Sequence, residues 1–179
     1  MEQIKIEENK KEIIRLLHST NREGIDKLSE WLENCDFFTA PASTRFHLNI
    51  KGGLAQHSLN VYNILKQILT LSNTNLSEPS IIICGLLHDT HKIDVYIPTK
   101  NGYAYQNDED FTIDGEISVK FIQQFISLTE DEKLAIRWHN GLYDVSPVLY
   151  NKYDFSMKKY KIVWLLHCAD MLASQIMEK

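Results

Sequence analysis

A chain of 179 residues can bury roughly two-thirds of the surface that its unfolded form exposes, which suits one domain with its own core. Apolar residues make up 44% and charged residues 24% of it, and this composition excludes a disordered chain. The net charge of -5 excludes a global positive field that recruits nucleic acid, although a local basic pocket is compatible with it.

The cysteines and the first residues of the sequence indicate in which cellular compartment the protein is expected. Cys35, Cys84 and Cys168 stand alone in apolar runs, which argues against a disulfide framework or a thiolate zinc site and favours core thiols in a reducing compartment. The first residues are acidic and amphipathic instead of basic and then apolar, and no window approaches about eighteen uncharged apolar residues. We therefore expect a cytoplasmic protein that does not contact a membrane.

Two amphipathic helices are expected before residue 36. Residues 2–17 place apolar side chains on one side at helical spacing. Thr20 and Glu23 have the spacing of a capping box, which predicts that a second helix begins there.

A loop and two helices are expected to follow. The segment that contains Arg45 and His47 is rich in proline, glycine and small polar residues, which is typical of a loop. In a helix over 54–71, His57 shares the apolar face, so its imidazole is expected to point inward. Residues 79–92 begin with an apolar run on all sides, and Ser77 followed by Pro79 is a plausible helix start, which favours a central helix over a buried strand.

The stretch 93–113 is the longest without helical periodicity. Asn101 and Gly102, between Tyr96 and Tyr103, are residue types that turn a β-hairpin. We expect an elaborated loop or a short hairpin here, which could act as a lid. Its aromatic side chains could stack on a base, but such residues more often pack on the domain beneath.

Three further helices complete the expected bundle. Asp114 is expected to open the first of them, and Thr129 with Glu132 forms a capping box before a helix that runs to His139. A final helix is expected from about residue 156 to 176. Because no repeat, low-complexity tract or linker interrupts the chain, the sequence predicts an all-α bundle in one domain.

Carboxylate and imidazole side chains recur in apolar surroundings. His88 and Asp89 follow the most apolar run, and Asp170 lies within the final apolar helix. Because burying an unpaired charge is costly, these groups must find partners. A divalent metal bound by imidazole and carboxylate explains the placement, and helix bundles build metal sites from inward-facing residues of this kind.

Four segments contain the histidines and aspartates in question: Gly-Gly-Leu-Ala-Gln-His-Ser at 52–58, Leu-Leu-His-Asp-Thr-His-Lys at 86–92, Ile-Arg-Trp-His-Asn-Gly at 136–141 and Leu-His-Cys-Ala-Asp-Met-Leu at 166–172. In this order they resemble the HD superfamily of metal-dependent phosphohydrolases, whose signature is a histidine, a later His-Asp pair and a distant aspartate. The resemblance covers most of the chain. It implies a single HD-type helical bundle over 1–179, with a helical elaboration at 1–36 and a motif-bearing core at 53–176.

The resemblance implies four ligands for a principal metal ion: His57, His88, Asp89 and Asp170. Asp89 could bridge to a second ion, for which His139 matches a family histidine. Asp114 stands where many relatives have a histidine, and Asn140 where a second consecutive histidine is common; Asp114 could equally be a helix N-cap. We expect one divalent ion and consider two. Mixed nitrogen and oxygen ligands suit zinc, manganese, magnesium, iron, cobalt and nickel alike.

The resemblance also implies that Asp89 and Lys92 are catalytic. A metal lowers the pKa of a bound water toward roughly 7, and Lys92, one helical turn beyond Asp89, could neutralise phosphoryl charge beside it. Arg45, His91 and Asn140 are further candidate contacts to the substrate. A solvated helix-end cation is the alternative interpretation of Lys92, and an ordinary loop residue that of Arg45.

Three functions are compatible with this sequence. The favoured one is hydrolysis of a phosphate ester or anhydride in a small nucleotide or deoxynucleotide. The second is phosphodiester cleavage, of a cyclic nucleotide or as a 3'-to-5' exoribonuclease, which is expected to need a basic groove that the sequence does not show. The third is a non-catalytic metal- or nucleotide-binding protein. This alternative stays open because the chain departs from the family pattern at His91, Asp114 and Asn140. A homo-oligomer is compatible with each.

Overall fold

The computed structural model describes residues 3–72, 74–106, 114–143 and 145–179. These residues are mostly helical, which confirms the expected all-α bundle with a short hairpin. The helices are α1 (Gln3–Ser19), α2 (Ile25–Asn34), α3 (Gly53–Ser72), α4 (Glu78–Leu87), α5 (Asp114–Ile122), α6 (Glu130–Arg137), α7 (Tyr150–Lys159) and α8 (Lys161–Leu172). The strands are β1 (Tyr96–Thr99) and β2 (Gly102–Tyr105), and the short helical turns are η1 (Thr90–Lys92), η2 (Pro147–Leu149) and η3 (Ala173–Met177).

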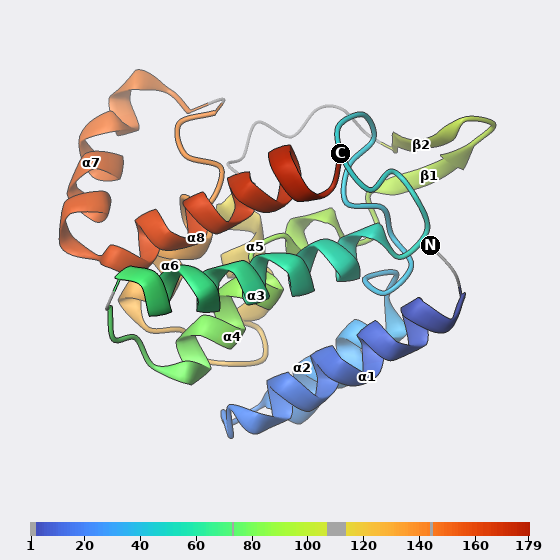
Figure 1. The fold of residues 1–179 in the computed structure, drawn as a ribbon, viewed down its shortest axis with the longest axis horizontal. Helices are drawn as coiled ribbons and strands as arrows, with labels where there is room; N and C mark the ends of the chain where they lie inside the picture. The colour runs from blue at the N-terminus through green and yellow to red at the C-terminus, as the bar shows by residue number, and fades with distance from the viewer. Residues whose placement is uncertain (1–2, 73, 107–113, 144) are drawn as a thin grey trace.

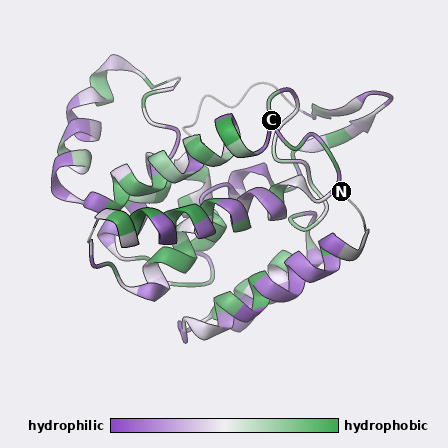
Figure 2. Cartoon of the chain, in the orientation of Figure 1, coloured by the Kyte–Doolittle hydropathy of each residue, from purple (hydrophilic) through white to green (hydrophobic). Residues whose placement is uncertain are grey.

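The helices that carry the candidate ligands pack together at the centre of the molecule. α3 lies between α4 and α8, and α6 packs on α4, α5 and α8 (Figure 1). α1 packs on α2 and also on α3 and α4. Hydrophobic residues gather on α3, α4 and α8, whereas α7 is largely hydrophilic (Figure 2). In the described ranges, no helix combines the length and apolar character needed to cross a bilayer.

The most deeply buried helix is α4, whose residues 80–87 all lie in the core. Ser77 caps its first turn by accepting a hydrogen bond from a backbone N–H, and a proline follows, as the sequence predicts. Gly85 lets α3 approach closely, because a Cβ atom there would lie 2.8 Å from the Cα atom of Tyr62. The spacing of α3 and α4 is therefore set by direct backbone contact.

The prediction of one helix over 79–92 is wrong at its C-terminal end. α4 ends at Leu87, and Asp89 has left the helical conformation, with φ −101° and ψ 17°. The hydroxyl of Thr90 donates to the carbonyl of Leu87 and so satisfies one of the acceptors that a helix end leaves open. The turn η1 follows. The His-Asp pair thus lies at the end of the buried helix and not within it.

The prediction of a capping box at Thr20 and Glu23 is also wrong. The Thr20 hydroxyl donates back to a carbonyl at the end of α1, and α2 begins only after Gly24, which has a left-handed conformation with φ 85°. A side chain at Gly24 would clash with the backbone carbonyl of Phe125. Tertiary packing therefore decides where α2 begins.

The second capping box is confirmed. Thr129 Oγ1 accepts from the backbone N–H of Glu132, and the Glu132 carboxylate accepts from the backbone N–H of Thr129. α5 begins at Asp114, as expected. α6 ends at Arg137, so His139 lies two residues beyond the helix that was expected to contain it.

The prediction of a single final helix over 156–176 is wrong, because two helices occupy this region. Tyr160 has an extended backbone, with φ −125° and ψ 109°, and separates α7 from α8. Ser156 lies in α7, where its hydroxyl accepts a hydrogen bond from the Trp138 indole and is buried. This anchor ties α7 to the residues that follow α6, and α8 then starts in a new direction.

The hairpin within 93–113 is confirmed. Tyr96 pairs with Tyr105 and Thr99 with Gly102, in antiparallel register. The two tyrosine rings lie 4.9 Å apart; Tyr96 is buried against the domain and Tyr105 is exposed. Residues 107–113 lie outside the described residues, so the lid expected for this segment stays a prediction.

Candidate metal centre

The four residues that the sequence suggests as ligands of the principal metal meet in the core. They come from α3, from the end of α4 and from α8: His57, His88 with Asp89, and Asp170. His57 Nε2 is 3.3 Å from His88 Nε2, 3.4 Å from an Asp89 oxygen, Oδ2, and 3.2 Å from an Asp170 oxygen, Oδ1. His88 Nε2 lies 3.5 Å from the same Asp89 oxygen. All four residues are buried, so their polar ends converge out of contact with bulk water.

The other oxygen of Asp89 faces a second group of side chains. His139 Nε2 lies 3.2 Å and His91 Nδ1 3.8 Å from Asp89 Oδ1. His91 Nε2 lies 3.5 Å from Asp114 Oδ2, and the Asn140 amide donates to that same oxygen at 3.3 Å. Asp89 therefore stands between two groups of imidazoles, with one oxygen turned to each.

The second group differs in detail from the pair that the sequence suggests. Asp89, His91 and His139 have ligand-type atoms within 4.8 Å of one another. The Asp114 side chain is 54% exposed and approaches this group through His91. His91, which the sequence suggests as a substrate contact, is thus grouped by the geometry with the candidate ligands.

Hydrogen bonds on the outer side of the cluster orient two of the imidazoles. The Nδ1 atoms of His88 and His139 lie 3.1 Å and 2.7 Å from the carbonyl oxygens of Gly85 and Ile136. A carbonyl can only accept, so each Nδ1 carries the hydrogen and each Nε2 turns a lone pair inward when the ring is neutral. Burial lowers the pKa of His88 to about 4, which keeps that ring neutral and available as a ligand.

Whether a metal ion would fit the cluster can be judged from the inward-facing Nε2 atom of His139. Within the described part of the chain, this buried atom has no hydrogen-bond partner of good geometry, although Asp89 Oδ1 lies 3.2 Å away. A lone pair that faces a carboxylate oxygen at this distance is repelled unless a cation or a proton lies between them. Imidazole nitrogens and carboxylate oxygens in this arrangement are a suitable donor set for a divalent metal.

The pKa shifts show that the centre attracts cations. Burial raises the pKa of Asp89, but Lys92 and the neighbouring imidazoles outweigh it and hold that pKa well below its usual range. Burial also raises the pKa of Asp170, and the hydrogen bond from His57 outweighs it, so this pKa is lowered too. Burial lowers the pKa of His57, but hydrogen bonds to Asp170 and Glu178 reverse the direction and raise it to about 9. Without a metal, the two charged carboxylates are thus balanced by the Lys92 ammonium and by protons on the imidazoles.

Lys92 is a basic side chain beside the cluster. Its ammonium donates to Asp89 Oδ2 at 2.6 Å, and the side chain is only 14% exposed. This contact does not fit the alternative of a solvated helix-end cation. Arg45, the other basic candidate, is exposed in the loop before α3.

Two residues beside the cluster were not among the expected ligands. Glu178 places both carboxylate oxygens 3.0–3.1 Å from His57 Nδ1. The His47 side chain, 9% exposed, packs with its ring centre 4.7 Å from that of His57. Burial lowers the pKa of His47 to about 4. A histidine in the loop just before the His57 helix is a weak sequence signal for His47, whereas nothing in the pattern around Glu178 distinguishes it from a surface residue.

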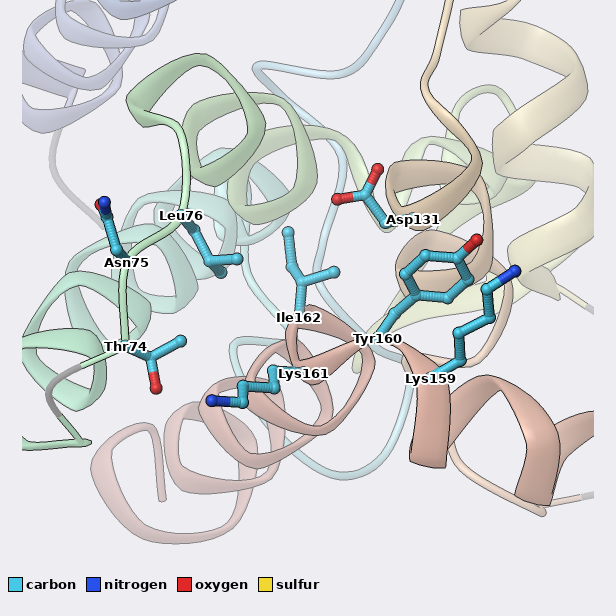
Figure 3. Close-up of a pocket in the computed structure, with 8 residues that line it drawn as sticks. All are labelled: Thr74, Asn75, Leu76, Asp131, Lys159, Tyr160, Lys161 and Ile162. Carbon is cyan, nitrogen blue, oxygen red and sulfur yellow. The ribbon is translucent and has the colours of Figure 1, made fainter.

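A surface cleft of about 380 Å³ lies away from this centre (Figure 3). It is bounded by the segment before α4, by Asp131 and by the α7–α8 junction. Lys161, in its wall, stands nine residues before Asp170 on α8, which is about 13 Å along the helix axis. The amino groups of Lys159 and Lys161 end on opposite sides of the cleft (Figure 3), so they do not converge on one ligand.

Comparison with known families agrees with the geometry. The model of the HD domain family matches residues 54–171, and the chain therefore belongs to the HD domain family. This family membership indicates a metal-dependent phosphohydrolase. The matched segment contains both groups of candidate ligands around Asp89. No curated protein and no solved structure matches the chain.

Proposed function

We propose that this protein hydrolyses a phosphate ester or anhydride in a small phosphorylated substrate, a nucleotide or deoxynucleotide, with the help of a divalent metal. The observation that carries the proposal is Asp89, a buried carboxylate with one oxygen toward His57 and His88 and the other toward His139 and His91. Membership of the HD domain family supports the same chemistry.

The chain's own residues have distinct roles in this proposal. His57, His88, Asp89 and Asp170 would hold the principal ion, with Asp89, His91 and His139 available for another. When bound, the metal supplies Lewis acidity and lowers the pKa of water. Lys92 lies beside Asp89 and would neutralise charge that develops on the non-bridging phosphoryl oxygens. The carbonyls of Gly85 and Ile136 keep the two imidazoles turned inward throughout.

A small substrate is favoured over a nucleic-acid strand. The chain carries a net charge of -5, and Lys92 is the basic group placed next to the cluster. Binding of a strand would require several cations that follow its phosphates. One buried lysine suits a single phosphoryl group.

The proposal is tested with protein purified without chelator. Bound metal is measured, and phosphate or pyrophosphate release is assayed over nucleotides, deoxynucleotides, cyclic nucleotides and short RNA. Release from mononucleotides supports the proposal. Cleavage confined to cyclic nucleotides or RNA would replace it with a phosphodiesterase, and a metal-bound protein inert toward every substrate would make the chain a non-catalytic member of its family.

Metal binding is expected to stabilise the fold. Adding Mn²⁺ or Zn²⁺ to chelator-treated protein, at 100 times the Kd, should raise the free energy of unfolding by about 2.7 kcal/mol. The ion would pair with the two buried carboxylates, which are otherwise balanced by the Lys92 ammonium and by protons on the imidazoles. Thermal unfolding with and without the ion measures the effect. Asp170→Asn should lose most of the shift, and an equal shift in this variant would remove Asp170 from the site.

Lys92→Gln is expected to lower kcat about 10²-fold while metal affinity is retained or increased. The lysine charge is nearly buried, so it acts strongly on phosphoryl oxygens, and its removal leaves Asp89 freer to bind a cation. Steady-state kinetics and metal titration measure the two effects separately. Lys100→Gln, in the exposed hairpin turn, is the matched control and should match wild type. An unchanged kcat in the Lys92 variant would contradict the assignment.

A further inference from the structure

The candidate ligand His57 is held on both sides of its ring by carboxylates from the same segment of chain. Asp170 Oδ1 lies 3.2 Å from Nε2 on the inner side, and Glu178 lies 3.0 Å from Nδ1 on the outer side. Asn60, one turn along α3 from His57, donates to Glu178 Oε1 at 2.8 Å. The Glu178 side chain is 2% exposed, so this is a buried contact.

The π-helix η3 explains how two residues eight positions apart reach the same imidazole. In a regular α-helix, each residue rotates about 100°, so Glu178 would point about 80° away from Asp170. η3 has wider turns, and the backbone N–H of Glu178 bonds to the carbonyl of Ala173, five residues earlier. This wider turn brings Glu178 back toward the face of Asp170. The end of the chain lies beside the loop that precedes α3 (Figure 1).

We infer that Glu178 is a positioning residue that holds the Nδ1 hydrogen of His57 and thereby keeps Nε2 aimed at Asp89 and Asp170. The inference rests on the proposed metal site. A carboxylate that accepts from the outer nitrogen fixes the tautomer and orientation of a ligating histidine and strengthens it as a donor. Without this acceptor, the Nδ1–H group of His57 would be buried without a partner.

The contacts favour this role over a separate ion between His47, His57 and Glu178. The Glu178 oxygens already accept from His57 Nδ1 and from the Asn60 amide. His47 Nε2 is farther away, at 3.7 Å from Glu178 Oε2. Its ring nitrogens have no hydrogen-bond partner within the described residues. Ligand-type atoms of these three residues lie within 4.8 Å of one another, but both Glu178 oxygens are already engaged, and we infer that His47 covers the contact between His57 and Glu178.

The test compares Glu178→Ala and Glu178→Gln with wild type by metal titration against a competing chelator. Glu178→Ala, which lacks the acceptor, is expected to weaken Zn²⁺ binding 10- to 100-fold. Glu178→Gln can still accept from Nδ1 and should lose less. Asn60→Ala, which removes one bond to the carboxylate, should also lose less than Glu178→Ala. Glu33→Ala, an exposed carboxylate on α2, is the control for loss of one negative charge and should bind as wild type.

A spectroscopic readout separates positioning from general damage to the fold. In Zn²⁺-loaded wild type, the Nδ1 proton of His57 should give a downfield NMR signal that exchanges slowly. In Glu178→Ala, that signal should move upfield or disappear into solvent exchange. Unaltered Zn²⁺ affinity and an unaltered signal in Glu178→Ala would overturn the inference. A further bound ion that His47→Phe abolishes would overturn it as well.

Neither measurement requires catalysis, so the inference and the proposed function can fail separately. If no nucleotide is hydrolysed but Glu178→Ala binds Zn²⁺ more weakly, the positioning role stands and the function falls. If nucleotides are hydrolysed and Glu178→Ala binds Zn²⁺ as wild type does, the function stands and the positioning role falls.

Discussion

Phosphate release is expected to fall by at least about 10³-fold when Asp89 is replaced by asparagine. Each Asp89 oxygen faces a different group of imidazoles, and Lys92 donates to one of the oxygens. An amide of the same shape lacks the negative charge that holds a cation between these groups. Losing about 4 kcal/mol of transition-state stabilisation, within the range that a metal supplies, corresponds to roughly this factor. Initial rates at saturating metal measure it.

The matched control for this experiment is Asp154→Asn. Asp154 is an exposed carboxylate on α7 that pairs with Lys158, and its replacement should leave the rate unchanged. Metal stoichiometry is measured in both variants, together with thermal stability. An Asp89→Asn protein that keeps a tenth of the wild-type rate would remove Asp89 from the reaction centre.

Replacing Arg22 by methionine is expected to reduce the free energy of unfolding by about 3 kcal/mol. Arg22 forms a two-pronged ion pair with Glu132 and also donates to the Ser127 carbonyl. Glu132 is completely buried and also accepts from the Ser80 hydroxyl and the Thr129 backbone N–H. The variant would leave a buried carboxylate without its cation. Denaturant unfolding of the metal-free protein measures the loss.

The ion pair of Arg22 and Glu132 also predicts how the loss of folding stability in Arg22→Met depends on pH. Burial raises the pKa of Glu132, but hydrogen bonds from Arg22 and Ser80 outweigh it and lower the pKa below its ordinary value. A carboxyl with a lowered folded pKa is stabilising above its unfolded pKa of about 4.3, and the stabilisation is lost as the pH falls through the folded value. Without Arg22, burial raises the pKa of Glu132 in the variant, so the difference in stability between wild type and Arg22→Met should be largest at neutral pH and shrink as the pH falls and the carboxyl takes up a proton.

Arg15→Met is the control for this pair. Arg15 also forms a two-pronged contact, with Glu12 on α1, but both side chains are exposed and solvent screens the attraction. No measurable change in unfolding is expected. Equal losses in the two variants, or a loss at Arg22 that is constant from pH 7 to pH 3, would contradict the burial argument.

Local patterns predict the elements that depend on local interactions. The Thr129 capping box, the Ser77 helix start and the hairpin at Asn101 and Gly102 are each decided by residues within a few positions of one another. The apolar run before His88 likewise predicts a buried element, and the helix start at Ser77 favours a helix over a strand there.

Elements set by distant contacts could not be predicted. The start of α2 depends on how closely Gly24 approaches Phe125, about a hundred residues later in the chain. The break at Tyr160 accompanies the bond between Trp138 and Ser156, and helical periodicity continues through it in the sequence. In both places tertiary packing overrides a local preference.

Some residues of the candidate site could likewise be predicted from the sequence, whereas others depend on the turns of the folded chain. The order of His57, His88, Asp89 and Asp170 along the chain suggests the principal ligands through a family resemblance, and the structure brings them together. The grouping of His91 with His139 follows from the turn that begins at Asp89, where a longer helix was expected. Glu178 reaches His57 only because of a π-helix, whose hydrogen-bond pattern leaves no periodic signal in the sequence.

The close contact at Gly85 links the geometry of the candidate metal centre to the helix interface behind it. The carbonyl of Gly85 binds His88 Nδ1, and the missing side chain of the same residue lets the backbone of Tyr62 approach. Tyr62 follows His57 on α3, so one residue governs both the rotation of one imidazole and its separation from the other. A larger residue at position 85 is consequently expected to push α3 and α4 apart and to widen the separation of His57 and His88, with every candidate ligand left as it is.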